Sequence, residues 1–140
     1  MTSFCVSLTS VPPRFTSLKK TLLSINNQNK KPEKIFLNIP KIFNRFEKIE
    51  YDFDILLKNF PNLVIRECDD FGPGTKLLGS LDQILNYDFV VLVDDDHIYK
   101  RQMLKIFYDL FLKDRNKSYS FCVYDILDCK VGQGADGFII

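Results

Sequence analysis

The chain has 140 residues, of which 46% are hydrophobic and 26% are charged, as in ordinary soluble globular domains. This length allows one hydrophobic core, so we expect a single domain spanning residues 1–140. A net charge of +1 argues against a nucleic-acid partner, and no apolar stretch approaches the roughly 20 residues of a membrane span.

The first half of the chain alternates strand and helix patterns. Residues 4–8 predict a strand, and Val11-Pro12-Pro13-Arg14 predicts a loop, since proline suits neither a helix interior nor a central strand. Apolar residues at helical spacing predict a helix that begins between residues 14 and 17 and includes Ile25. The following segments are a strand at 34–39 ended by Pro40, a loop at 41–51, a short helix at 52–60 and a strand at 63–68.

The second half continues the alternation. Residues 69–74 predict a loop and 89–93 a buried parallel strand. Residues 75–85 predict one helix, with its inward side formed by Leu77, Leu78, Leu81, Ile84 and Leu85. An amphipathic helix follows, marked by Met103, Ile106, Phe107, Leu110 and Phe111, then a strand at 119–124 and a final apolar run at 138–140. The alternation predicts an α/β fold, a three-layer sandwich with a mostly parallel central sheet.

Three consecutive carboxylates, Asp94, Asp95 and Asp96, follow the apolar strand at 89–93. The carboxyl ends of strands in open α/β sheets are where ligands bind. Adjacent acids repel one another, and a divalent cation such as Mn²⁺ or Mg²⁺ relieves that repulsion. Side chains alternate along an extended chain, so Asp94 and Asp96 are the expected metal ligands and Asp95 points the other way. The alternative is a solvated acidic turn before the next helix.

Several other motifs are excluded. An EF-hand beginning at Asp94 needs Gly at its sixth position and Glu at its twelfth, where this chain has Tyr99 and Lys105. Gly74-Thr75-Lys76 reverses the residue order of a phosphate-binding Walker A loop. We also discount a protease-like triad, because it would have to use His97, the only histidine and a direct neighbour of the acids.

The segment Asp69–Lys76 predicts a tight turn that approaches a ligand, because Gly72 and Gly74 flank Pro73. The helix start at Thr75 and the charge of Lys76 favour an anion. A nucleotide diphosphate would fit, with Lys76 or the helix start on phosphate and Asp70 on the base or sugar. The alternative is an ordinary strand-to-helix turn.

Two further groups complete the candidates. Thr9, Ser10 and Arg14 follow the first strand at the same edge of the sheet, where Arg14 is either a phosphate or base contact or a plain surface arginine. In Gly134-Ala135-Asp136-Gly137 the glycines would leave the backbone free to deliver Asp136 into a cleft, where Asp136 is expected to be either a general base for an acceptor hydroxyl or a turn residue.

The cysteines indicate a reducing compartment. Cys5, Cys68, Cys122 and Cys129 form no CxxC pair, and with one histidine they do not suggest a zinc site. The N-terminus lacks the basic region and apolar core of a signal peptide. We therefore expect a cytoplasmic protein.

These motifs carry a resemblance. Asp94-Asp95-Asp96 looks like the DxD motif of the GT-A class of nucleotide-sugar glycosyltransferases. Together with Ser10–Phe15, Asp70–Lys76 and Gly134–Gly137, in that order along the chain, it resembles more narrowly a small family from large DNA viruses and bacteria. That family includes the N-terminal glycosyltransferase domain of a multidomain chlorovirus enzyme. GT-A domains usually continue further with a segment that completes the acceptor site, so we expect a domain shortened at its C-terminus.

The resemblance implies a Rossmann-like GT-A fold, a nucleotide-diphosphate sugar donor, Mn²⁺ or Mg²⁺, and a glycan or other hydroxyl acceptor. It places Asp96 on the metal, Asp94 on the metal's waters or the ribose, and Asp136 where inverting enzymes have their base. The implied donor-binding residues are Thr9, Arg14, Asp70, Lys76, Asp94 and Asp95. For a viral protein the implied compartment is the host cytoplasm. A retaining course, a nucleotidyl- or phosphotransferase and a non-catalytic nucleotide-binding remnant stay as alternatives.

Overall fold

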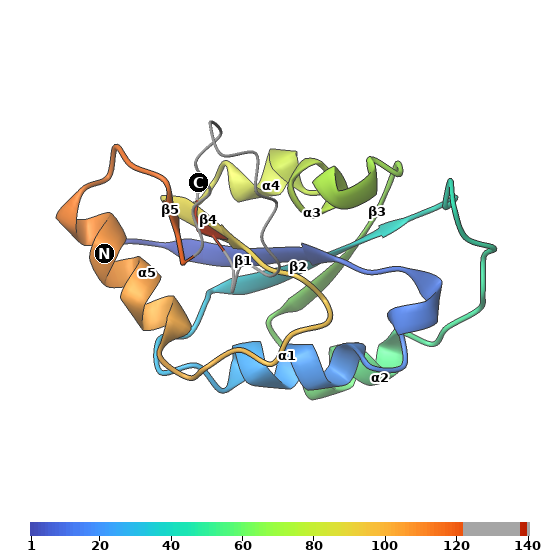
Figure 1. Ribbon diagram of the computed structural model, residues 1–140. Helices are drawn as coiled ribbons and strands as arrows, with labels where there is room; N and C mark the ends of the chain where they lie inside the picture. The colour runs from blue at the N-terminus through green and yellow to red at the C-terminus, as the bar shows by residue number, and fades with distance from the viewer. Residues whose placement is uncertain (122–137, 140) are drawn as a thin grey trace.

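A mixed β-sheet runs through the middle of the molecule (Figure 1). The computed structural model describes residues 1–121 and 138–139, and within them the strand order is β3-β2-β1-β4-β6-β5. β1 to β4 run parallel to one another, whereas β6 is antiparallel to both β4 and β5. The strands are β1 Phe4–Thr9, β2 Lys34–Pro40, β3 Leu63–Cys68, β4 Phe89–Leu92, β5 Tyr119–Ser120 and β6 Phe138–Ile139.

Helices cover both faces of this sheet (Figure 1). One face carries α1 (Leu18–Asn26), α2 (Asp54–Asn59) and α5 (Met103–Lys113), and the other carries α3 (Thr75–Leu78) and α4 (Leu81–Ile84). The fold is therefore α/β, three-layered and Rossmann-like, which confirms the predicted class.

Alternation along the strands divides the core into two unequal layers. In β1, Phe4, Val6 and Leu8 face the layer of α1, α2 and α5, whereas Cys5 faces α3 and α4. The second layer is small, with a buried apolar cluster of Cys5, Phe36, Ile84, Val90 and Leu92. Because both faces are covered, the central strands read as continuous apolar runs in the sequence.

The predicted single helix at 75–85 is wrong, because the chain breaks at Gly79 and Ser80 into α3 and α4. Gly79 packs so closely on Asn38 of β2 that a Cβ there would lie 2.6 Å from the Asn38 Cβ. The break resets the helical register. Of the five predicted inward residues, Ile84 is buried and Leu77 partly buried, whereas the exposed ones are Leu78, Leu81 and Leu85.

Smaller differences occur elsewhere. The predicted loop at residues 11–14 contains a single 3₁₀ turn, η1 (Pro12–Arg14), which tolerates proline in its first positions. A second such turn, η2 (Gly72–Gly74), lies within the predicted loop at 69–74. In α5, Met103, Phe107 and Phe111 are buried as predicted, whereas Ile106 is exposed. Residues 122–124 of the predicted fifth strand lie outside the described residues.

Within the described part of the chain, no helix is both long enough and apolar enough to cross a membrane.

Candidate functional site

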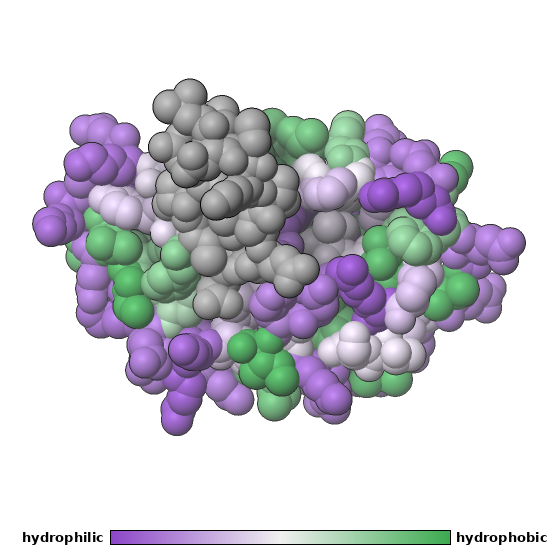
Figure 2. Space-filling model, viewed as in Figure 1, coloured by the Kyte–Doolittle hydropathy of each residue, from purple (hydrophilic) through white to green (hydrophobic). Residues whose placement is uncertain are grey.

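A cavity of about 500 Å³ opens at the carboxyl ends of β1 and β4. β2 lies on one side of β1 in the sheet and β4 lies on the other. The strand order therefore reverses between β1 and β4, and α/β sheets bind ligands at such a switch point. In the space-filling view, some hydrophilic side chains lie near the middle of the face that is shown, and more of them lie towards its edges (Figure 2). Each predicted site residue within the described chain lines this cavity: Thr9, Arg14, Asp70, Lys76, Asp94, Asp95 and Asp96. Asp136 lies outside the described residues.

Asp95 faces the protein interior, as the alternation of side chains predicts. Its side chain is buried and accepts hydrogen bonds from Ser10 Oγ at 2.5 Å and from an Arg14 guanidinium nitrogen at 2.7 Å. Its backbone carbonyl accepts a third hydrogen bond, from Thr21 Oγ1 of α1 at 2.8 Å. The hydrogen bond and negative charge of Asp95 raise the pKa of Arg14 above its ordinary value. Asp95 thus fixes Arg14 at the cavity wall.

Asp94, Asp96 and His97 form a group with the chemistry of a metal site. One ligand atom from each lies within 4.8 Å of the others, and His97 Nδ1 is 2.8 Å from Asp96 Oδ1. Two carboxylate oxygens and an imidazole nitrogen suit Mn²⁺ and related divalent ions. The residues present therefore fit a divalent cation. Sequence reasoning did not propose His97 as a candidate ligand, although its place directly after the acids was a usable signal.

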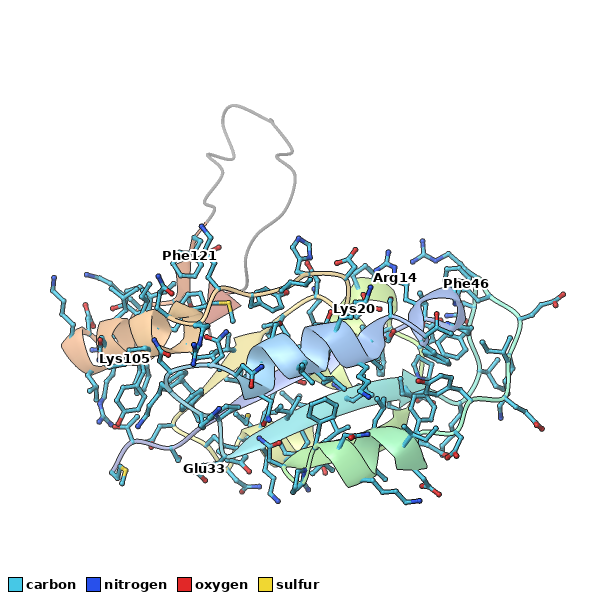
Figure 3. The ribbon with its side chains drawn as sticks, turned by 90° about the horizontal axis from the view of Figure 1, so that it is seen from below. Arg14, Lys20, Glu33, Phe46, Lys105 and Phe121 are labelled. Carbon is cyan, nitrogen blue, oxygen red and sulfur yellow. The ribbon has the colours of Figure 1, made fainter. Side chains whose placement is uncertain are left out.

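Basic groups from two other segments face the same acids. Lys76 Nζ of α3 forms an ion pair with Asp94 Oδ1, and an Arg14 nitrogen lies 3.4 Å from Asp96 Oδ2. Arg14 lies near the start of α1 at the same end of the molecule as Phe46, which also lines the cavity (Figure 3). The cavity thus offers acidic ligands for a cation beside basic groups for an anion.

A buried polar network under α3 holds Lys76 in place. Ser7 Oγ donates a hydrogen bond to the Lys76 carbonyl at 2.6 Å, and Asn38 Nδ2 donates to Ser7 Oγ at 3.0 Å. Ser80 Oγ in turn donates to Asn38 Oδ1. Sequence reasoning missed these residues, although Ser7 and Asn38 interrupt otherwise apolar strands. Buried polar groups inside strands need partners, and here the partners position a cavity residue.

Asp70 joins two loops at the other side of the cavity. Its two carboxylate oxygens accept hydrogen bonds from the backbone N–H groups of Asn44 at 2.7 Å and Gly72 at 2.8 Å. These bonds lower the pKa of Asp70. Gly72 has a φ of +60°, a conformation that favours glycine. Thr9 Oγ1 donates to the Asn38 carbonyl at 2.7 Å and so ties the end of β1 to β2.

Comparisons with known proteins identify the fold through solved structures. No family model and no curated protein sequence matches this chain. The crystal structure of S. aureus TarS residues 1–349 matches at 18% identity with a TM-score of 0.58, covering 81% of this chain and 33% of that one. Its complex with UDP matches at 16% identity and a TM-score of 0.60, with the same coverage.

The glycosyltransferase GlyE of Streptococcus pneumoniae matches over 100% of this chain and 34% of its own, at 17% identity and a TM-score of 0.56. The chain thus spans about a third of the length of these structures. At such identities the likeness shows the fold alone, which is the fold of glycosyltransferase structures.

Proposed function

We propose that this chain is the nucleotide-binding part of a metal-dependent glycosyltransferase, which moves a sugar from a nucleotide-diphosphate donor to an acceptor hydroxyl. The observation that carries the proposal is one cavity at the strand ends that combines Asp94, Asp96 and His97 with Lys76 and Arg14. A diphosphate with its cation needs both sets of charges. The fold of GlyE and the TarS complexes with UDP and UDP-GlcNAc support the same function.

Each residue has a role in this proposal. Asp94, Asp96 and His97 would hold the cation, Mn²⁺ or Mg²⁺, and Lys76 and Arg14 bind the diphosphate oxygens. Thr9 and Asp70 lie on the nucleoside side, where Asp70 also keeps the two loops together. Asp95 assists the donor through Arg14. When bound, the cation stabilises the negative charge that develops on the departing nucleoside diphosphate.

The transfer itself requires a group that accepts the proton of the acceptor hydroxyl. We assign this role to Asp136, from its glycine-flanked position in the sequence. The acceptor oxygen attacks the anomeric carbon, the bond from that carbon to the phosphate oxygen breaks, and the proton moves to the Asp136 carboxylate. This direct displacement inverts the anomeric centre.

The test is a donor panel of UDP- and GDP-sugars with Mn²⁺, in which calorimetry follows donor binding and the released product is identified. We expect a nucleoside diphosphate as the product. Asp96→Ala should abolish metal-dependent donor binding, because it removes a ligand, whereas Asp109→Ala, at an exposed position of α5, should leave it unchanged. Asp136→Asn should retain donor binding and suppress transfer.

Other outcomes have clear meanings. Pyrophosphate as the product would indicate a nucleotidyltransferase instead. Donor binding without turnover by any tested sugar would indicate a nucleotide-binding remnant. Unchanged donor affinity in the Asp96 variant would place the metal elsewhere and contradict the proposed site.

A further inference from the structure

Acidic and basic side chains at the strand ends already form ion pairs with one another. Lys76 Nζ contacts Asp94, and Arg14 contacts both Asp95 and Asp96. Asp94 therefore has two competing roles: it is the ion-pair partner of Lys76, and it is one of the three residues that can hold a cation. A divalent cation and the Lys76 ammonium repel each other strongly when both lie against one carboxylate.

Lys76 and Arg14 differ in how firmly they are held. Arg14 is bound to Asp95, whose side chain is only 5% exposed, and its contact with Asp96 is the longer one. Among the described residues, Lys76 forms an ion pair with a single carboxylate, that of Asp94, whose side chain is 39% exposed. Of the two basic groups, Lys76 is the one that a cation can displace.

The displaced Lys76 side chain stays in the cavity. Its backbone carbonyl is fixed by Ser7 and Asn38, so α3 does not move away with it. Four methylene groups separate this fixed backbone from the ammonium, which can swing to a new partner inside the same cavity. The other acid on that side, Asp70, already accepts backbone hydrogen bonds at both oxygens.

We propose that Lys76 and the divalent cation exchange places on Asp94, and that the displaced ammonium then binds the donor diphosphate. This inference rests on the proposed function and adds a mechanism to it. The cation alone leaves Lys76 without its carboxylate, and the diphosphate alone faces Asp94 and Asp96. When both ligands are bound, the cation faces Asp94 and Asp96 and the diphosphate faces Lys76. Each ligand therefore raises the affinity of the other.

The experiment is a calorimetric titration of Mn²⁺ with and without saturating UDP, on the wild type, Lys76→Met and Arg45→Met. Arg45 lines the same cavity and supplies the same change of charge, but no ion pair joins it to the acids among the described residues. Lys76→Met should bind Mn²⁺ alone at least about fivefold more tightly than the wild type, whereas its UDP affinity and the mutual enhancement should both fall. Arg45→Met should keep the wild-type Mn²⁺ affinity.

The outcomes separate this inference from the proposed function. If the wild type binds both ligands but Lys76→Met binds Mn²⁺ no more tightly, or if Arg45→Met shows the same gain, exchange at Asp94 is wrong and the proposed function stands. If the wild type binds neither ligand, both fail. Lys76→Gln serves as a second variant, and urea unfolding of each variant verifies that it is folded.

Discussion

Asp95 lies between two acids of the candidate metal group, yet its own side chain is buried against Ser10 and Arg14. Its charge therefore supports the fold as well as the site. Removing the charge leaves Arg14, which is half-exposed, without its closest partner, and it weakens the hydrogen bonds of a buried group.

We expect Asp95→Asn to lower the free energy of unfolding by about 2–3 kcal/mol, since a buried carboxylate loses its charge-assisted hydrogen bonds to Ser10 and to the half-exposed Arg14. The matched control is Asp94→Asn, whose ion pair with Lys76 is partly exposed and should cost less than about 1 kcal/mol. Urea unfolding followed by circular dichroism measures both. Equal losses in the two variants would contradict the structural role of Asp95.

Cys5 is fully buried in β1, and burial, with the nearby charge of Glu33, raises the pKa of its thiol from 9.0 to about 12. In the unfolded chain the thiol ionises near pH 9, but in the folded protein it stays protonated. The unfolded state therefore gains stability as the pH rises, and the contribution of Cys5 to folding is lost between pH 9 and 12.

We expect the wild type to lose about 1.4 kcal/mol more per pH unit than Cys5→Ala between pH 9 and 11. Lysines and tyrosines titrate in both proteins, so the difference in slope isolates the thiol. Urea unfolding at pH 8, 9, 10 and 11 gives the two slopes. Parallel slopes would show that the thiol of Cys5 ionises equally in the folded and unfolded chains.

At the scale of single elements, the break between α3 and α4 connects the fold to the site. Gly79 allows close packing on Asn38, and Asn38 takes part in the network that holds the Lys76 carbonyl. A side chain at residue 79 would thus disturb both the packing of α3 on the sheet and the position of Lys76 in the cavity.

Gly79→Ala should destabilise the protein by about 1–3 kcal/mol, because its Cβ would meet the Asn38 side chain and the Thr75 carbonyl below 3.0 Å. Gly74→Ala is the control, since its Cβ would meet its nearest heavy atom, Leu78 Cδ1, at an ordinary 3.8 Å. Urea unfolding and UDP titration of both variants provide the measurements. A fully stable Gly79→Ala protein would contradict the close contact.

The strands could be predicted from sequence because buried parallel strands are apolar runs, as in residues 89–92 of β4. The helix break could not, because it depends on a contact between Gly79 and Asn38, which are distant in the sequence. Local periodicity in 75–85 looks continuous, and only the packing of α3 on the sheet interrupts it.

The location of the site could be predicted, because its residues follow the carboxyl ends of the strands. Acids after β4, Arg14 after β1 and Lys76 after β3 meet in one cavity because parallel strands end at one edge of the sheet. Alternation along the chain predicts that Asp95 points away from Asp94 and Asp96. Its pairing with Arg14, and that of Asp94 with Lys76, could not be predicted, since these contacts join segments that are distant in the sequence.

At the scale of the whole molecule, the sheet has a parallel part, β1 to β4, and a second part in which β6 runs antiparallel to its neighbours. β1 to β4 are parallel and come from the first 92 residues, and they frame the cavity. β6 then lies between β4 and β5, so that the last described strand is inserted into the sheet, whereas the earlier β5 lies at its edge.

This insertion has a consequence for how the protein is made. During translation, β1 to β4 can pair with one another once residue 92 has left the ribosome, because these mutual pairings involve no later residue. Within the described residues, β5 pairs only with β6, so Tyr119 and Ser120 must wait for a segment synthesised after them. Until β6 is synthesised, the edge of β4 that β6 will cover keeps its backbone N–H and C=O groups free to pair with a wrong strand. We therefore expect the nascent chain to be most prone to mispairing during this interval.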